Sequence, residues 1–196
     1  WNNKKDIVKS MILSRLKYNN KICANKTKTI NIKLEVKNNF LEKNHIQGKD
    51  SSTTYLGLIY NDELIACMTF SKLKTANNYE LIRYASKLNT NVIGGASKLL
   101  KEFRKTHEGP IVSYADRRWS SGRLYDKLGF KLNEIIKQDF FYYNINKKTV
   151  HDNAKFRKDS LTNMPFYDAN LTEYDIMKLN GYERIWDSGH VRYVLS

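Results

Sequence analysis

The residue types best suited to chemistry lie between positions 79 and 130 of this 196-residue chain. Gly94 and Gly95 precede an apolar pattern of helical spacing, which predicts a glycine turn followed by a helix over 97–105. Glycines let the backbone approach a ligand, and a helix N-terminus presents N–H groups and the positive end of its dipole. Lys98 in the first turn adds charge. The turn therefore indicates a phosphate site, although a turn that uses glycine only for its backbone angles explains the pattern equally well.

A strand predicted over 79–86 carries two ionisable residues, Glu80 and Arg83. Strict alternation places them on opposite faces of the sheet, Glu80 with Tyr84 and Arg83 with Leu81. A polar side chain on each face of a central strand requires a partner or a function.

A second group of polar residues follows the strand predicted over 111–115. Two arginines beside a tryptophan suit phosphate contact and base stacking, and the C-terminal end of such a strand is a common place for a site. Pairing of Arg with Asp, with the Trp covering the core, is the structural alternative. The cluster consists of Asp116, Arg117, Arg118, Trp119, Ser120 and Ser121.

His45 and Gln47 lie in a polar segment after the helix predicted over 33–43. Both residue types can hydrogen-bond a base edge or polarise a substrate. A lone histidine is more often a capping or core residue, and both alternatives remain open.

Hydrophobic periodicity and turn residues predict the elements that position these groups. A hairpin is expected from two strands joined by Asn61, Asp62 and Glu63, and a short helix is expected over 122–128, ended by Gly129. Further predictions are a basic helix over 6–16, a short strand over 21–28, one or two closing strands within 134–146, a basic loop over 147–160, a helix over 172–179, and a final hairpin from 183–187 and 191–195.

The formal net charge is +14, which favours an anionic partner, nucleic acid first; simple solubility of a Lys-rich chain is the alternative. No apolar run reaches the ~20 residues of a membrane helix, and no signal peptide is recognised, so a cytoplasmic location and no membrane partner are expected.

Cys23 and Cys67 are expected to be reduced core thiols. The four histidines show no ligand spacing, so no metal site is predicted. Because the chain begins at Trp1, we expect it to be part of a longer polypeptide, or to have lost a leader or tag.

Two segments resemble the GNAT-fold acyltransferases. Asn91-x-x-Gly94-x-Ala96 is similar to their pyrophosphate-binding turn, and Tyr114-Ala115-Asp116 followed by Gly122 to Phe130 resembles the next strand and helix. The resemblance implies an α+β fold with a central mixed, mostly antiparallel sheet flanked by helices, and acetyl-CoA or another acyl donor. It places the donor on Asn91, Val92, Gly94, Gly95, Ala96, Ser97 and Lys98, makes Tyr125 the general acid, and makes Glu80 or Asp116 the base.

The whole chain resembles more closely the GNAT-like domain that follows Hef- and Vsr-type endonuclease domains in phage homing endonucleases, a fold shared with Mom DNA-modification proteins. The resemblance implies DNA as partner, an upstream endonuclease domain and a phage-infected host cell. The matching residues include His45 to Gly48, Glu80, Arg83, Gly94 to Lys98, Ser113 to Ser120, Tyr125 and Ile185 to Asp187. No nuclease motif lies within these 196 residues.

Three functions remain open, and the first is preferred because the Gly94 to Lys98 turn and Tyr125 look like a donor site. The first is a Mom-like transferase acting on DNA, in which the target is held by His45, Gln47, Arg83, Tyr114, Arg117, Arg118, Trp119 and Ser120. The second is a non-catalytic DNA-targeting module, and the third is an acetyl-CoA-dependent acetyltransferase of a protein or small amine. The predicted organisation is a basic lead-in over 1–28, a GNAT-like core over 29–150 and a small αβ extension over 151–196 packed on that core.

Overall fold

The computed structural model describes residues 4–74, 78–156 and 158–196, and the chain divides into two units. Unit 1 comprises 1–114, 122–133 and 192–196, and unit 2 comprises 115–121 and 134–191. This division differs from the expected boundaries at 28 and 150. The N-terminal helix belongs to the large unit, and unit 2 begins earlier because residues 140–144 form part of its own small sheet.

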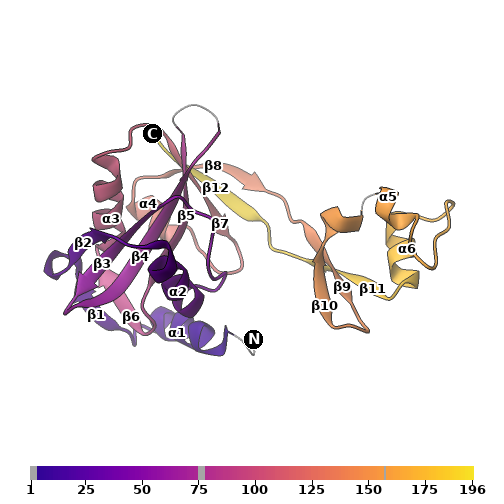
Figure 1. Cartoon of the computed structure of the whole chain (residues 1–196), viewed down its shortest axis with the longest axis horizontal. Helices are drawn as coiled ribbons and strands as arrows, with labels where there is room; N and C mark the ends of the chain where they lie inside the picture. Colours follow the sequence, from indigo (N-terminus) through magenta and orange to yellow (C-terminus); the bar gives the residue numbers. More distant parts are fainter. Residues whose placement is uncertain (1–3, 75–77, 157) are drawn as a thin grey trace. The chain divides into compact units, whose positions relative to one another are not determined.

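A seven-stranded sheet has the order β2-β3-β4-β5-β7-β12-β8 (Figure 1). Its pairings β2–β3, β3–β4 and β4–β5 are antiparallel, and β5 and β7 are parallel, so the predicted mixed, mostly antiparallel sheet is confirmed. The strands are β2 (Lys28–Asn31), β3 (Thr54–Tyr60), β4 (Glu63–Lys72), β5 (Tyr79–Ser86), β7 (Ile111–Asp116), β8 (Lys131–Ile136) and β12 (His190–Leu195).

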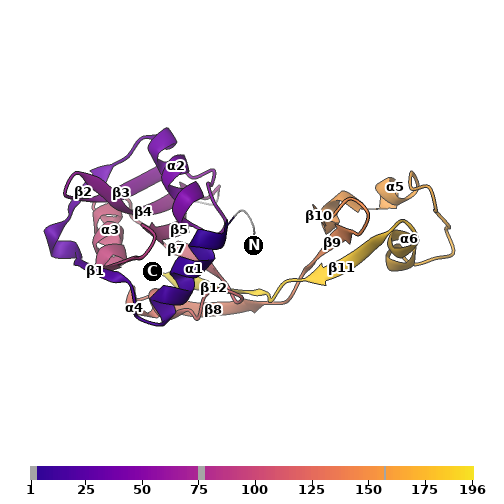
Figure 2. The ribbon, with the colours of Figure 1, turned by 90° about the horizontal axis from the view of Figure 1, so that it is seen from below.

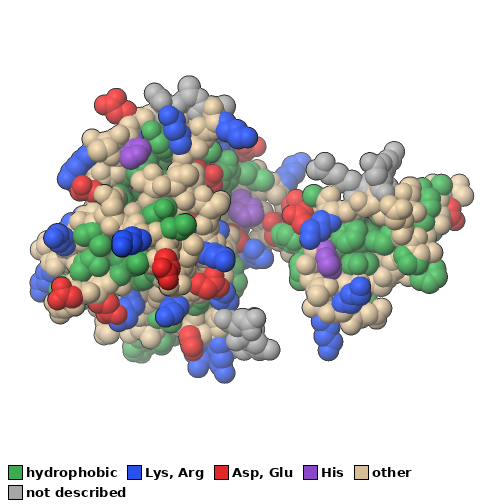
Figure 3. Space-filling model, viewed as in Figure 1, with side chains coloured by type: hydrophobic (Ala, Val, Ile, Leu, Met, Phe, Trp, Pro, Cys, Tyr) green, Lys and Arg blue, Asp and Glu red, His purple; other side chains and the backbone are tan. Residues whose placement is uncertain are grey.

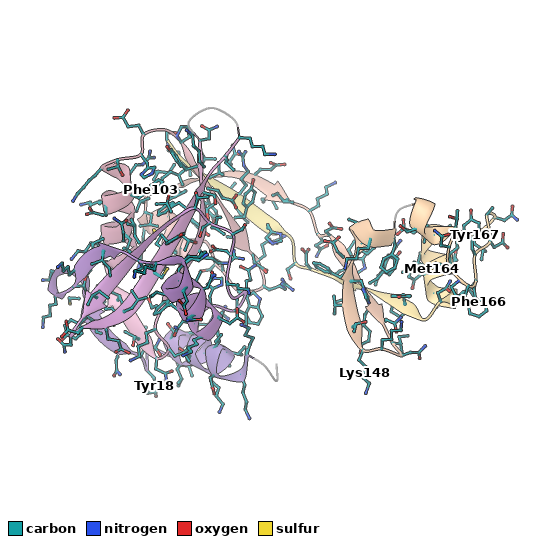
Figure 4. The ribbon with its side chains drawn as sticks, in the orientation of Figure 1. Tyr18, Phe103, Lys148, Met164, Phe166 and Tyr167 are labelled. Carbon is teal, nitrogen blue, oxygen red and sulfur yellow. The ribbon has the colours of Figure 1, made fainter. Side chains whose placement is uncertain are left out.

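Helices cover both faces of this sheet in unit 1. Leu41 of α2 (Leu34–Asn44) packs with Cys67 of β4. Phe103 of α3 (Gly95–Arg104), labelled in Figure 4, stacks on Phe70 at a centroid distance of 3.7 Å. Because Cys67 and Phe70 are three residues apart on one strand, α2 and α3 lie on opposite faces, as the two ribbon views show (Figures 1 and 2). The helix α1 (Lys5–Arg15) is tied to α2 by the Lys4–Glu42 ion pair.

The predicted hairpin is confirmed, and the residues of its tight turn explain why it forms here. β3 and β4 are joined at Asn61 and Asp62, which have φ values of 47° and 60°. Positive φ at both central residues is the conformation of a two-residue hairpin turn, and Asn and Asp tolerate it better than most residues.

The strand predicted over 21–28 is instead divided. β1 (Asn20–Cys23) pairs in parallel with β6 (Thr90–Ile93), a 3-10 turn, η2, occupies Ala24–Lys26, and β2 begins at Lys28. One short segment therefore contributes strands to two sheets, and hydrophobic periodicity does not detect the turn between these strands.

Unit 2 has a sheet of its own, ordered β10-β9-β11. Tyr142 and Met177 are fully buried in its core, and the loop between α5 and α6 carries Phe166 and Tyr167 (Figure 4). Its elements are β9 (Phe140–Asn144), β10 (Thr149–Asp152), η3 (Asn153–Phe156), α5 (Lys158–Leu161), α6 (Glu173–Leu179) and β11 (Tyr182–Trp186).

Two predictions for this region are wrong. Residues 147–160 hold β10 and η3 rather than only a loop. The final hairpin does not form, because β11 pairs with β9 whereas β12 lies between β7 and β8. Gly189, with φ of +71°, lies between the two strands, and the Asp187 carboxylate accepts hydrogen bonds from Asp139 N–H and Gly189 N–H.

Candidate active site

β5 and β7 pair over only two residue positions, Tyr79 with Ile111 and Glu80 with Val112. Just beyond them the Ser113 hydroxyl donates a hydrogen bond to the Leu81 carbonyl, at 2.7 Å. The two strands are therefore held together at their N-terminal ends and pair no further. Backbone groups left without a strand partner inside a sheet need another partner, and an extended ligand can supply one.

The glycine turn adjoins the unpaired part of β5. The hydroxyl of Tyr84 on β5 accepts the Ala96 N–H at the start of α3, and burial raises the pKa of this tyrosine. Gly94 has φ of +77°, and a Cβ on Gly95 would lie 2.8 Å from the Tyr84 hydroxyl and 2.9 Å from Val92 Cγ1. Glycine is therefore required at the two positions for different reasons. Gly94 has a left-handed backbone, whereas at Gly95 a side chain would collide with its neighbours.

Asn91 and Val92 belong to β6, and Ser97 and Lys98 lie in the first turn of α3. The Lys98 amine, which we expected to add charge to the phosphate site, donates to the carbonyl groups of Ala24 (2.9 Å) and Thr27. Any phosphate contact at this turn therefore has to come mainly from backbone N–H groups.

Tyr125 lies in α4 (Arg123–Lys127) with its hydroxyl directed at β7. Its oxygen is 3.0 Å from the Ser113 hydroxyl and donates to the Tyr114 carbonyl at 3.4 Å, while the Tyr114 side chain is exposed. The ring stacks on Tyr193. Burial raises the pKa of Tyr125, although the Ser113 hydrogen bond lowers it, so the phenol keeps its proton at neutral pH. A protonated phenol near neutral pH is suited to general-acid catalysis.

A β-bulge on β5 overturns the strict alternation expected there. Thr69 pairs with Arg83 but Phe70 pairs with Leu81, so Ile82 is the extra residue. Glu80 pairs with Ser71, two positions from Thr69 on β4. Residues paired across strands share a face; Glu80 and Arg83 therefore lie on the same face, not on opposite ones.

Glu80 and Arg83 are half-buried and influence each other electrostatically. Burial raises the pKa of Glu80, and the charge of Arg83 partly offsets this effect. Burial lowers the pKa of Arg83, opposed by the carboxylates of Asp50 and Glu80. Arg83 also lowers the pKa of Tyr125, so residues from β5 and α4 share one field.

His45 joins this group from the end of α2. Burial, followed by the charge of Arg83, lowers its pKa to about 4. Its Nδ1 accepts the backbone N–H of Gln47, whose side chain is exposed. His45 is thus neutral at physiological pH, and of the predicted target-binding residues it and Arg83 are brought together.

Sequence reasoning missed a buried ion pair beside this group, between Lys37 and Asp50. Their N–O distance is 2.9 Å, and their side chains are 0% and 4% exposed. Asp50 also accepts a hydrogen bond from Thr69, and with Lys37 it influences Cys67, whose thiol pKa is raised to about 12 by burial. A detectable signal was present, because Lys37 falls on the apolar stripe of α2 with Phe40 and Leu41.

The cluster after β7 belongs to unit 2. Arg118 binds the Asp116 carboxylate through Nε and Nη2, the latter at 2.7 Å, and its backbone N–H adds a third contact. Burial raises the pKa of Asp116, but these contacts lower it further, and the net shift is downward. The carboxylate is a weak base, and Glu80 is the better base candidate. Arg117 and Trp119 have exposed side chains and Ser120 is half-buried.

Comparison with solved structures identifies the fold as that of the GNAT acetyltransferases. The ribosomal-protein-S18-alanine N-acetyltransferase of Escherichia coli superimposes with a TM-score of 0.51 at 12% identity, over 86% of this chain and 92% of that one. Ard1 of Thermoplasma volcanium gives a TM-score of 0.50 at 10% identity, over 87% and 97%. No model of a known protein family matches the chain, and no curated protein sequence does.

The predicted GNAT-like α+β fold is therefore confirmed. The relation to Mom proteins and to endonuclease-associated domains stays a prediction. Among the residues that the structure describes, no helix is long and apolar enough to cross a membrane, and no group of three His, Cys, Asp or Glu side chains could hold a metal ion.

Proposed function

We propose that the chain is an acetyl-CoA-dependent acyltransferase that acetylates an amine. The single observation that carries this proposal is the separation of β5 from β7 beside the glycine turn, with Tyr125 at one strand and Glu80 on the other. The fold shared with solved acetyltransferases supports it.

The residues present fit such a donor. The Gly94–Gly95 turn opens a ten-residue helix, whose N-terminal N–H groups favour phosphate oxygens. The unpaired edges of β5 and β7 would accept amide groups of an extended arm. Acetyl-CoA, when bound, supplies an acetyl group activated as a thioester.

Each side chain then has a defined proton to move. Glu80, with its raised pKa, would accept a proton from the attacking amine. Tyr125 would give its proton to the departing sulfur, with Ser113 fixing the position of the phenol oxygen. Arg83 and His45 would face the acceptor.

Tyr125→Phe tests the proposal. Turnover should fall about 100-fold or more, the usual contribution of a general acid, while acetyl-CoA still raises the melting temperature as in wild type. Tyr193→Phe is the matched control, because the Tyr193 ring stacks on Tyr125 but its hydroxyl takes part in no proposed proton transfer. Turnover of this variant should stay within a few-fold of wild type. Unchanged turnover in Tyr125→Phe would remove this residue from the mechanism.

A second candidate is binding of nucleic acid, either for Mom-like base modification or for targeting an associated nuclease. The observation favouring it is charge: unit 1 holds 24 Lys and Arg against 10 Asp and Glu, whereas unit 2 holds 10 of each. The entire excess of +14 therefore belongs to the unit with the candidate active site. Lys and Arg are spread over its visible surface (Figure 3).

A further inference from the structure

The face of β5 that carries Glu80 and Arg83 presents a carboxyl group and a guanidinium that are not paired directly with each other. Within the residues that the structure describes, neither side chain forms an ion pair within 4 Å, and Arg83 Nη1 donates only to the Ile82 carbonyl. Arg83 Nε is buried and has no hydrogen-bond acceptor among those same residues. A buried, unsatisfied guanidinium N–H is costly, and a bound ligand is one way to satisfy it.

The bulge sets the spacing of the two groups. Their partners on β4, Ser71 and Thr69, are two residues apart, so the two side chains start about 7 Å from each other on one face. Such a spacing leaves room for an ammonium group against Glu80 and a carboxylate against Arg83. The guanidinium fork is matched to a carboxylate in particular.

We propose that the acceptor is a free α-amino acid, bound as a zwitterion with its carboxylate on Arg83 and its amine on Glu80. This inference rests on the proposed acetyltransferase function. A dianionic phosphate group is less compatible, because Asp50 and Glu80 already place two carboxylates around Arg83. A single negative charge, delivered together with a positive one, leaves the local charge unchanged.

The transfer balances as follows. A C–N bond forms between the amino acid and the acetyl carbon, and the thioester C–S bond breaks. Of the two protons that the ammonium group loses, one goes to Glu80 and then to solvent. The other replaces the proton that Tyr125 gives to the sulfur. Arg83 is a binding residue in this scheme and moves no proton.

The test compares amino acids with their own carboxamides, which keep the amine and side chain but lose the carboxylate. Wild-type protein should prefer the acids by about 10- to 100-fold in kcat/KM, the contribution of a charged hydrogen-bonded contact. Arg83→Gln should remove this preference, and Arg83→Lys should restore part of it. Arg123→Gln, which removes one exposed charge in the same unit, should keep the wild-type preference.

Calorimetric binding of the same acids and amides without acetyl-CoA gives a readout independent of turnover. Binding of acids but not amides to wild type, lost in Arg83→Gln with its melting temperature retained, supports the proposal. Equal use of acids and amides, or preference for O-phosphoethanolamine or for peptides, overturns it. If acetyl-CoA raises the melting temperature but no amino acid is bound or acetylated, the acceptor proposal fails while the donor site stands. Absence of any effect of acetyl-CoA would count against the acetyltransferase itself.

Discussion

Lys37 shows how a single charged residue in the interior restricts which substitutions the site tolerates. Its amine is fully buried and is compensated by the carboxylate of Asp50, which in turn holds Ser52 and Thr69. Both oxygens of the carboxylate are therefore occupied, and the segment after α2 that carries His45 is fastened to β4.

Asp50→Asn should destabilise the protein by about 3–5 kcal/mol, because it leaves the Lys37 ammonium buried without a counter-charge. Urea unfolding of the variant and of wild type gives the difference. The exposed Lys87–Glu63 pair is the control, and Glu63→Gln should cost less than about 1 kcal/mol. Equal effects of the two substitutions would show that burial of the Lys37 pair has no energetic importance.

His45 predicts a pH dependence of stability. Its pKa is about 4 in the folded protein, against 6.5 for an ordinary histidine, so between these values the unfolded chain binds the extra proton. Stability therefore falls as the pH drops from 6.5 towards 4, by about 3 kcal/mol over the full window. His45→Gln should flatten this part of the curve, as measured by urea unfolding at several pH values. Parallel curves for the two proteins would contradict the low pKa.

At the scale of elements, the glycine turn and the helix after it allow two kinds of strain to be separated. Gly95→Ala places a Cβ against the Tyr84 hydroxyl and Val92, and overpacking of this kind costs about 1–3 kcal/mol. It should also displace the start of α3 and weaken acetyl-CoA binding, as measured by calorimetry.

Gly94→Ala is the companion variant, because its Cβ would meet only Ala24 Cβ at 3.7 Å. Its cost is the left-handed backbone, about 1–2 kcal/mol, without crowding. If Gly95→Ala bound acetyl-CoA as well as wild type, the close contact with Tyr84 would be unimportant for the donor site.

Most elements of unit 1 were predictable from sequence, because the hairpin turn, the glycine that ends α4 and the hydrophobic periods are local signals. The assignment of the β5 side chains to the two faces of the sheet was not predictable. Alternation separates Glu80 from Arg83, and only the pairing of β5 with β4 reveals the bulge at Ile82 that brings them together. The prediction that Lys98 adds charge to the phosphate site was wrong for a similar reason, because the carbonyl groups that bind its amine, at Ala24 and Thr27, are more than 70 residues away in the chain.

The topology of unit 2 was also beyond local reasoning. β11 and β12 have the spacing of a hairpin and a glycine between them, yet each pairs with strands from an earlier part of the chain. Which strand a segment joins depends on burial elsewhere in the molecule, and a single sequence does not display it.

At the scale of the whole molecule, the charge belongs to one unit. If nucleic acid is a partner, its affinity should fall steeply with salt, with a slope set by the number of phosphates contacted. Replacing the exposed Lys5, Lys9 and Lys17 of the N-terminal region by Gln should lower that slope by up to about 3, as measured by fluorescence anisotropy of labelled duplex DNA.

The control for this prediction is Lys147→Gln with Lys148→Gln, two exposed lysines of the neutral unit (Lys148 is labelled in Figure 4). It should leave the slope unchanged. A flat response of wild-type protein to salt would exclude a partner recognised through its phosphates.

The position of β12 has a consequence for folding during synthesis on the ribosome. This strand lies inside the seven-stranded sheet, between β7 and β8, but it follows the whole of unit 2 in the chain. During synthesis the nascent sheet therefore lacks one of its interior strands until residues 190–195 emerge from the ribosome. Until then, the edges of β7 and β8 that border this position have no strand partner. We expect the ribosome-bound chain to be most vulnerable to aggregation in that interval, although every residue of the candidate active site has already been made.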